Sequence, residues 1–98
     1  MKELDLAGNK IGDEGVRLIV NALLSKPKVG LTLLNLSDNL ITSAGCKLVC
    51  SLVDKARYLD DLQLQNNDID NHGAQRLVES LKKRKVAALN IDNNSVSG

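Results

Sequence analysis

The stretch LNLSDNLI, residues 34–41, decides the fold, because related copies of it recur along this chain of 98 residues. The copies share the pattern L-x-L-x-x-N-x-I, with Ile and Val as replacements in the fourth. They are LDLAGNKI at 4–11, LQLQNNDI at 62–69 and LNIDNNSV at 89–96. Their starts step by 30, 28 and 27 residues (4 to 34, 34 to 62, 62 to 89). Self-similarity at such a period predicts stacked structural units that share one continuous core.

The first half of each copy predicts a short strand that ends at the asparagine. Its two apolar residues alternate with period two, so both point to the buried side of a sheet. The asparagine amide both donates and accepts, so it can satisfy backbone groups where the chain turns. We interpret the four copies of this residue as a structural ladder with one amide per layer: Asn9, Asn39, Asn67 and Asn94.

A glycine eleven residues after the start of a copy marks the change to helical periodicity; it is Gly15, Gly45 and Gly73 in the first three copies. Counted from this glycine, positions +1, +4, +5 and +8 carry small or apolar residues, which is one face of a helix. A helix of about ten residues is too short to be stable alone, so it must pack on its strand and on its neighbours. The positions predicted to be buried are Val16, Ile19, Val20, Leu23, Cys46, Val49, Cys50, Val53, Ala74, Leu77, Val78 and Leu81.

The composition agrees with a stack of equivalent aliphatic layers. Apolar residues make up 43% of the chain, yet Tyr58 is the only aromatic, whereas a compact single core usually takes bulk from aromatics. The formal net charge is +1, from 13 basic and 12 acidic residues, so no overall charge draws the chain to nucleic acid or to a membrane. No apolar run approaches the roughly 20 residues of a membrane span, and the first residues lack the features of a signal peptide.

Few residues are candidates for metal or redox chemistry. Cys46 and Cys50 occupy helix positions +1 and +5, where the other copies have Val or Ala, so we predict that they pack as small hydrophobes. Two cysteines do not form a disulfide framework, which favours a reducing, cytoplasmic location. The lone His72 lies in a predicted polar turn, and no zinc-ligand spacing exists. We therefore expect neither a metal nor a cofactor.

The sequence also gives no support for catalysis. The chain has one histidine, no glycine-rich phosphate loop and no serine in a nucleophile elbow, so we expect neither an enzyme nor a small-molecule substrate. We interpret Asp60-Asp61 and Asp68-x-Asp70 as solvated loop charge. The run Lys82-Lys83-Arg84-Lys85 is interpreted as a solvated helix end that complements the helix dipole. The alternative for this run is a nuclear-localisation or phosphate-binding patch, although the absence of interleaved aromatics argues against binding single-stranded nucleic acid.

The full pattern, L-x-x-L-x-L-x-x-N-x-I-x-x-x-G-x-x-x-L-x-x-x-L at 27–30 residues per copy, resembles the ribonuclease-inhibitor-like class of leucine-rich repeats over essentially the whole chain. Ribonuclease inhibitor, NOD-like receptors and Ran GTPase-activating protein share this class. The resemblance implies an α/β leucine-rich-repeat solenoid, a right-handed β-α superhelix with a curved parallel sheet inside and helices outside. It also implies an intracellular protein that binds other proteins through the concave face of the sheet. This chain departs from ribonuclease inhibitor in having one repeat type and only two cysteines.

We predict one domain over residues 1–98, made of three full repeats and a truncated fourth. The chain opens directly on a strand and ends before its fourth helix, without the capping repeats that shield the ends of a solenoid. It is therefore expected to be a fragment, or the repeat core, of a longer protein. Uncapped strand edges pair readily with other chains, so we also expect self-association through the ends.

The partner-binding surface is predicted from strand alternation. Residues at −1, +1, +3 and +4 from the first leucine of a copy should face the concave side. The candidates for partner binding are Glu3, Asp5, Leu33, Asn35, Ser37, Asp38, Asp61, Gln63, Gln65, Asn90 and Asp92. Five of the residues at these positions are acidic and none is basic, which predicts a basic protein partner. The alternative is that Asp and Asn stand there because they suit strand ends and turns.

These features favour a protein-protein interaction module without catalysis. The alternative function is that of a GTPase-activating protein fragment resembling Ran GTPase-activating protein, by analogy of fold alone. That activity needs particular surface residues in loops beyond several strands, and no residue of this chain can be matched to one. A third interpretation is a part of the ligand-sensing or autoinhibitory repeat array of a receptor.

Overall fold

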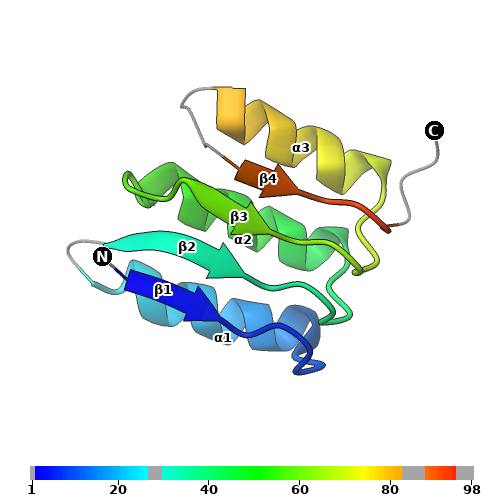
Figure 1. Cartoon of the computed structure of the whole chain (residues 1–98), viewed down its shortest axis with the longest axis horizontal. Helices are drawn as coiled ribbons and strands as arrows, with labels where there is room; N and C mark the ends of the chain where they lie inside the picture. Colours follow the sequence, from blue (N-terminus) through cyan, green and yellow to red (C-terminus); the bar gives the residue numbers. More distant parts are fainter. Residues whose placement is uncertain (1, 27–29, 83–87, 95–98) are drawn as a thin grey trace.

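The computed structural model describes residues 2–26, 30–82 and 88–94, in which strands and helices alternate along the chain. The strands are β1 (Lys2–Asp5), β2 (Leu31–Asn35), β3 (Asp61–Gln63) and β4 (Ala88–Asn90), and the helices are α1 (Gly12–Leu24), α2 (Ser43–Lys55) and α3 (Asn71–Lys82). The strands form one parallel sheet in the order β1-β2-β3-β4, and the three helices cover one face of it (Figure 1). This arrangement confirms the predicted α/β repeat solenoid.

The repeated leucines form a continuous row across the sheet. The register pairs Leu4 with Leu34, Leu34 with Leu62, and Leu62 with Leu89. Leu34 and Leu62 are fully buried, whereas Leu89 on the edge strand is 36% exposed. Burying a leucine contributes about 1.5–3 kcal/mol relative to leaving it exposed, so the inner layers hold the stack together.

The helices begin two or three residues before the repeated glycines. All four positions predicted to be buried in α2 are buried, as are Val16 and Val20 in α1. The prediction is wrong for Val78 of α3, which is 42% exposed. Its position faces the next helix of the stack, since Cys50 at the same position of α2 contacts Ser80 of α3. Among the described residues no helix follows α3, so Val78 stays uncovered.

The second and third of these glycines are required because the first turn of each helix lies close to the preceding loop or helix. A Cβ atom on Gly45 would lie 2.8 Å from Ile41 Cγ2 and against the Asp13 carboxylate. One on Gly73 would lie 2.7 Å from Ser43 Oγ. Only a residue without a side chain fits there. The repeated glycine therefore reflects close packing around the start of the helix.

A second backbone requirement lies four residues after the start of each copy. Gly8, Asp38, Asn66 and Asn93 all have a positive φ, between 56° and 72°. Glycine, asparagine and aspartate tolerate this left-handed conformation best. Asp38, one of the candidate binding residues, therefore lies in the turn beyond β2 rather than in the strand.

Some predictions fall outside the described residues. They concern Lys83, Arg84 and Lys85 of the basic run and Val96 of the fourth copy. That residues 1–98 form one domain without capping repeats stays a prediction. Within the described part of the chain, no helix has the length and apolar character needed to cross a membrane.

Candidate functional site

The face of the sheet that the helices leave uncovered, here called the open face, carries two rows of candidate residues (Figure 1). Their side chains alternate with the buried leucines and so point away from the helices. The register sets the first row side by side as Glu3, Leu33, Asp61 and Ala88. The second row is Asp5, Asn35, Gln63 and Asn90. The parallel sheet thus brings residues from four separate segments onto one surface.

The first row places two carboxylates on either side of an apolar residue. Glu3 is exposed and Asp61 is partly exposed, and Leu33 lies half-buried on the strand between them. Neighbouring strands lie about 4.8 Å apart, so the backbones of Glu3 and Asp61 are about 10 Å apart across Leu33. Asp61 accepts a hydrogen bond from Gln63 Nε2 at 2.6 Å. This row therefore offers negative charge around an apolar centre.

The second row closes turns at the ends of three strands. The Asp5 carboxylate accepts a hydrogen bond from the Ala7 backbone N–H at 3.1 Å. Asn35 and Asn90 accept the equivalent bonds two residues on, at 3.1 Å and 2.9 Å. Such side-chain turns favour Asp and Asn for a local structural reason. The turn interpretation therefore accounts for Asp5, but it does not account for Glu3 and Asp61.

Further candidates lie beyond the strands, at the carboxyl edge of the sheet. Ser37 is buried, and its hydroxyl donates to Asn35 Oδ1 at 2.8 Å. Asp38 and Asp92 are exposed. The Gln65 side-chain oxygen is buried and has no hydrogen-bond partner among the described residues. Because an unpaired buried acceptor is costly, Gln65 offers an acceptor that a donor group of a bound partner would satisfy.

The asparagines of the predicted ladder lie where the chain turns after each strand. Asn67 Oδ1 accepts hydrogen bonds from the backbone N–H groups of Asn39 at 2.9 Å and Ile41 at 3.0 Å. Its Nδ2 donates to the carbonyl groups of Leu36 at 3.1 Å and Leu64 at 3.0 Å. One side chain therefore satisfies backbone groups of two neighbouring repeats.

The other asparagines of the ladder make related bonds. Asn39 accepts from the Asn9 backbone N–H at 2.8 Å, and Asn94 accepts from the Ile69 backbone N–H at 3.0 Å. Asn39 and Asn67 are 0% and 6% exposed, whereas Asn9 and Asn94 are more exposed. The amides of the two buried members are occupied by the fold, so they are unavailable to a partner.

Two aspartates outside the predicted ladder hold the starts of helices. Asp13, in the first turn of α1, accepts hydrogen bonds from the backbone N–H groups of Thr42 at 2.8 Å and Gly45 at 3.0 Å, and from the Thr42 hydroxyl. Asp70, directly before α3, accepts from the Gly73 backbone N–H at 3.1 Å and from the Ser43 hydroxyl. The hydrogen bond from Ser43, followed by that from Gly73, lowers the pKa of the Asp70 carboxyl.

Asp70 is an exposed loop residue, as the interpretation of solvated loop charge predicts, but its carboxylate also caps α3 and joins it to α2. An aspartate three residues before the N–H that it accepts from has the spacing of an N-cap, so the sequence contained a signal for Asp70. No local pattern exists for Asp13, which caps a helix that starts about 30 residues later in the chain.

Both cysteines lie in the core. Cys46 is 0% exposed and Cys50 is 4% exposed, and the Cys46 thiol donates to the Gly73 carbonyl with 3.4 Å between sulfur and oxygen. The hydrogen bond with Cys50, together with burial, raises the pKa of the Cys46 thiol. Packing in the hydrophobic cluster is thus the role in which the structure places these side chains.

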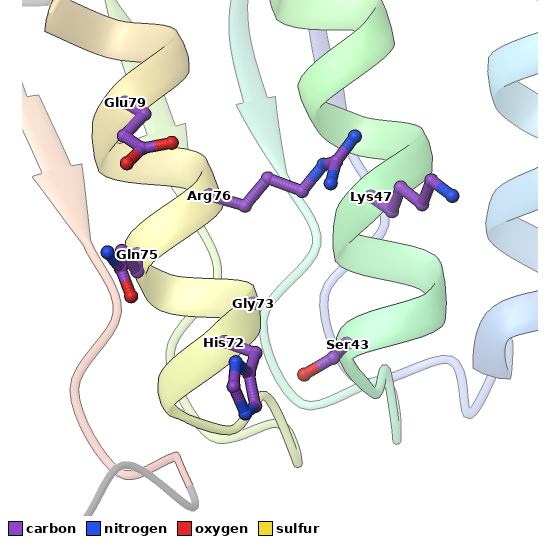
Figure 2. Close-up of a pocket in the computed structure, with 7 residues that line it drawn as sticks. All are labelled: Ser43, Lys47, His72, Gly73, Gln75, Arg76 and Glu79. Carbon is purple, nitrogen blue, oxygen red and sulfur yellow. The ribbon is translucent and has the colours of Figure 1, made fainter.

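A groove of about 280 Å³ lies on the outer side of the molecule, between α2 and α3 (Figure 2). Its lining mixes cationic, anionic and neutral side chains: Ser43, Lys47, His72, Gly73, Gln75, Arg76 and Glu79. Ser43, His72 and the adjacent Asp70 are the residue types of a nucleophilic triad. The Ser43 hydroxyl, however, donates to Asp70, and within the described residues no hydrogen bond joins it to His72. A base must contact the nucleophile that it activates, whereas here the Ser43 hydroxyl is hydrogen-bonded to the Asp70 carboxylate.

Comparison with known proteins finds the same repeat. The family model described as Leucine Rich repeat matches residues 1–20, 31–50 and 55–78. Over 83 residues, the chain is 39% identical to the ribonuclease inhibitor of Sus scrofa and 37% identical to that of Mus musculus, covering 85% of this chain and 18% of each relative. It is 36% identical over 83 residues to the NACHT, LRR and PYD domains-containing protein 13 of Homo sapiens, covering 85% of this chain and 8% of that protein. The chain thus spans less than a fifth of the length of these relatives.

A solved structure shares the architecture. The chain of Leiomodin-1 Actin-Binding Site 2 (ABS2) matches with a TM-score of 0.82 and 18% sequence identity, over 96% of this chain and 54% of that chain. At this level of identity the likeness concerns the fold alone.

Proposed function

The chain belongs to the leucine-rich-repeat family, in its ribonuclease-inhibitor-like class, and on that premise we propose that it binds another protein through the open, concave face of its sheet. It acts as an interaction module and not as an enzyme. The name of a similar protein supports this role, since it is an inhibitor of ribonuclease.

The observation that carries the proposal is the first row of the open face. Glu3 and Asp61 present carboxylates that no turn requires, and they flank the half-buried Leu33. The 13 basic residues of the chain all lie outside the positions assigned to this face. A surface of one charge sign steers a partner of the opposite sign and speeds its association. The partner is therefore a protein with a basic binding surface.

Charge reversal on this face tests the proposal. Replacing both Asp61 and Glu3 by Lys should slow association with the partner by about tenfold at low ionic strength, because steering contributes at least that much to charged interfaces. The partner is first captured with the full-length protein and purified, and association is then followed by surface plasmon resonance. The matched control is Asp54→Lys with Glu79→Lys, which makes the same charge change on exposed residues of α2 and α3.

The salt dependence gives a second readout. The wild-type association rate should fall as ionic strength rises, and the doubly reversed variant should lose most of this dependence. If the double variant and added salt both leave the association rate unchanged, the open face does not recognise a basic protein.

A cytoplasmic location belongs to the same proposal. It is supported by Cys46 and Cys50, which are free thiols in the structure, as is usual in a reducing compartment.

Self-association through the ends of the stack is a further part of the proposal. Apolar side chains are exposed at both ends of the described structure: Leu18 on α1 at 59%, Val78 on α3 at 42% and Leu89 on β4 at 36%. The edges of β1 and β4 also have no neighbouring strand on their outer side among the described residues. Exposed strand edges pair with other chains, and a lysine on such an edge blocks pairing.

Light scattering tests this association. The wild-type chain should form dimers or larger species at millimolar concentration, and Leu89→Lys should shift it toward the monomer. Lys47→Glu on the outer surface of α2 serves as a control that leaves the ends unchanged. A wild-type chain that stays strictly monomeric at this concentration would exclude pairing of the ends.

A further inference from the structure

Leu40 is placed unfavourably in two independent ways. It lies in the loop between β2 and α2, where its φ of 61° is in the left-handed region. A branched apolar side chain is disfavoured in that conformation. The same side chain is 58% exposed to solvent. Neither the backbone conformation nor the exposure favours a leucine at this position.

The loop does not need a leucine for its own structure. The equivalent residue of the first repeat is Lys10, which is also left-handed, with a φ of 52°, and exposed. Backbone and asparagine contacts hold the loop: the Gly12 N–H donates to the Asn39 carbonyl at 2.8 Å, and the Asp68 N–H donates to the Ile41 carbonyl at 2.7 Å. Leu40 is absent from the side chains that pack on the core. A role outside the fold therefore explains it better than packing.

Leu40 also differs in place from the other exposed apolar residues. In the described part of the chain, Leu18, Val78 and Leu89 lie at the ends of the stack, and Tyr58 lies in the loop that leads into β3. Leu40 lies instead among the loops that follow the carboxyl ends of the strands, here called the carboxyl rim and made of residues 6–11, 36–42, 64–70 and 91–94 (Figure 1). It sits in the middle of the array, beside the open face.

The charges around Leu40 indicate what could cover it. Asp38 lies two residues before it, and Asp68 lies in the adjoining loop of the next repeat; both are exposed. Neither forms an ion pair with another described residue. Asp92 adds a further negative charge one repeat further along the rim. Lys10 is the only basic residue of the carboxyl rim, and it lies on the other side of Leu40, in the loop of the first repeat.

We infer that Leu40 is the apolar anchor of a second contact zone on the carboxyl rim, which takes a protein segment that carries an apolar side chain close to a basic one. The apolar side chain covers Leu40, and the basic side chain lies against Asp38 and Asp68. Lys10 repels the basic residue from the side of the first repeat, so the basic residue lies on the side of the third repeat. This inference rests on the proposed function, because the same bound protein would contact the open face and its rim.

A defined peptide probe tests the inference. Random peptides displayed on phage are selected on the immobilised wild-type chain, and the best binder is synthesised for measurement of its Kd. The selected peptides should carry Lys or Arg close to an apolar residue. Replacing Leu40 by Asn should raise the Kd about tenfold or more, as for an anchor in an interface. Lys10→Asn makes the matching substitution at the equivalent left-handed position and should not raise the Kd.

Thermal unfolding separates binding from folding. Asparagine tolerates the left-handed conformation better than leucine or lysine, so the Leu40→Asn and Lys10→Asn chains should both unfold at or above the wild-type temperature. Weaker binding together with unreduced stability would identify Leu40 as a contact residue. A marked loss of stability in Leu40→Asn would show instead that the side chain supports the fold, and would overturn the inference.

The remaining outcomes distinguish the inference from the proposed function. If Asp61→Lys weakens binding of the peptide and Leu40→Asn does not, the open face binds and the rim does not, so the inference alone fails. If Leu40→Asn weakens binding of the peptide and Asp61→Lys does not, the rim contact holds independently of the open face, whose role is decided by the association rate of the purified partner with the doubly reversed variant. Selected peptides without basic residues would overturn the inferred partner chemistry.

Discussion

Replacing Leu62 by Ala should lower the free energy of unfolding by about 2–5 kcal/mol, the usual cost of removing a fully buried leucine side chain. Leu62 is 0% exposed and lies in register between Leu34 and Leu89. Strands on both sides and helices on one face restrict collapse around the missing side chain, so a cavity remains. A small domain has only about 5–15 kcal/mol of stability in total, so this single change should remove a large part of it.

Urea denaturation followed by circular dichroism measures this loss. The matched control is Leu89→Ala, the same substitution at the equivalent position of β4, where the side chain is 36% exposed. The control should cost clearly less, because less apolar surface returns to water. Equal losses at the two positions would contradict a core whose inner layers are the better packed.

The second large effect is expected from Asn67→Ala, which should cost about 1–3 kcal/mol because it leaves buried polar groups without partners. The lost amide accepts from the backbone N–H groups of Asn39 and Ile41 and donates to the carbonyls of Leu36 and Leu64. Alanine can replace none of these bonds. The Asn67 side chain is 6% exposed, so water reaches the stranded groups poorly.

The control for the ladder is Asn94→Ala. Asn94 makes related bonds to the third repeat, but it is more exposed than Asn67. Water can take over part of its hydrogen bonding, so its loss should be smaller when both variants are compared by chemical denaturation. Equal, near-zero losses for Asn39→Ala, Asn67→Ala and Asn94→Ala would show that the ladder does not stabilise the stack.

Much of the candidate site follows from the alternation of the strands. The residue on either side of a buried strand leucine must point to the other face of the sheet, and the equal spacing of the copies aligns these residues into rows. The sequence left open whether the acidic residues serve a partner or a turn. The hydrogen bond from Ala7 to Asp5 assigns Asp5 to a turn. Glu3 and Asp61 lie within their strands, before the turn that follows each strand. Only the hydrogen bonds of the folded chain separate acidic residues that close a turn from acidic residues that do not.

The one wrong prediction of burial, at Val78, and the unpredicted features of Asp70 and Leu40 became visible only in the folded chain. Val78 was assigned to a buried helical face, but its position is covered only when a further helix packs beside it. Asp70 is exposed, as predicted, but its hydrogen bond with Ser43 of the preceding repeat was not predicted. The left-handed backbone at Leu40 was not predicted, although Lys10 at the equivalent position shares it. For Val78 and Asp70 the deciding neighbour lies one repeat away in the chain.

The amino-acid sequence was enough to predict the repeating unit, its strand and helix, the leucine core and the position of the asparagines. It was enough because these features repeat within each copy and follow local periodicities of two and about 3.6 residues. The tertiary structure alone decided the cap from Asp13 to the next helix, the exposure of Val78 and the placement of Leu40 on an acidic rim. The physical reason is that burial, capping and charge depend on atoms contributed by neighbouring repeats, and no pattern within one repeat specifies what its neighbours bring.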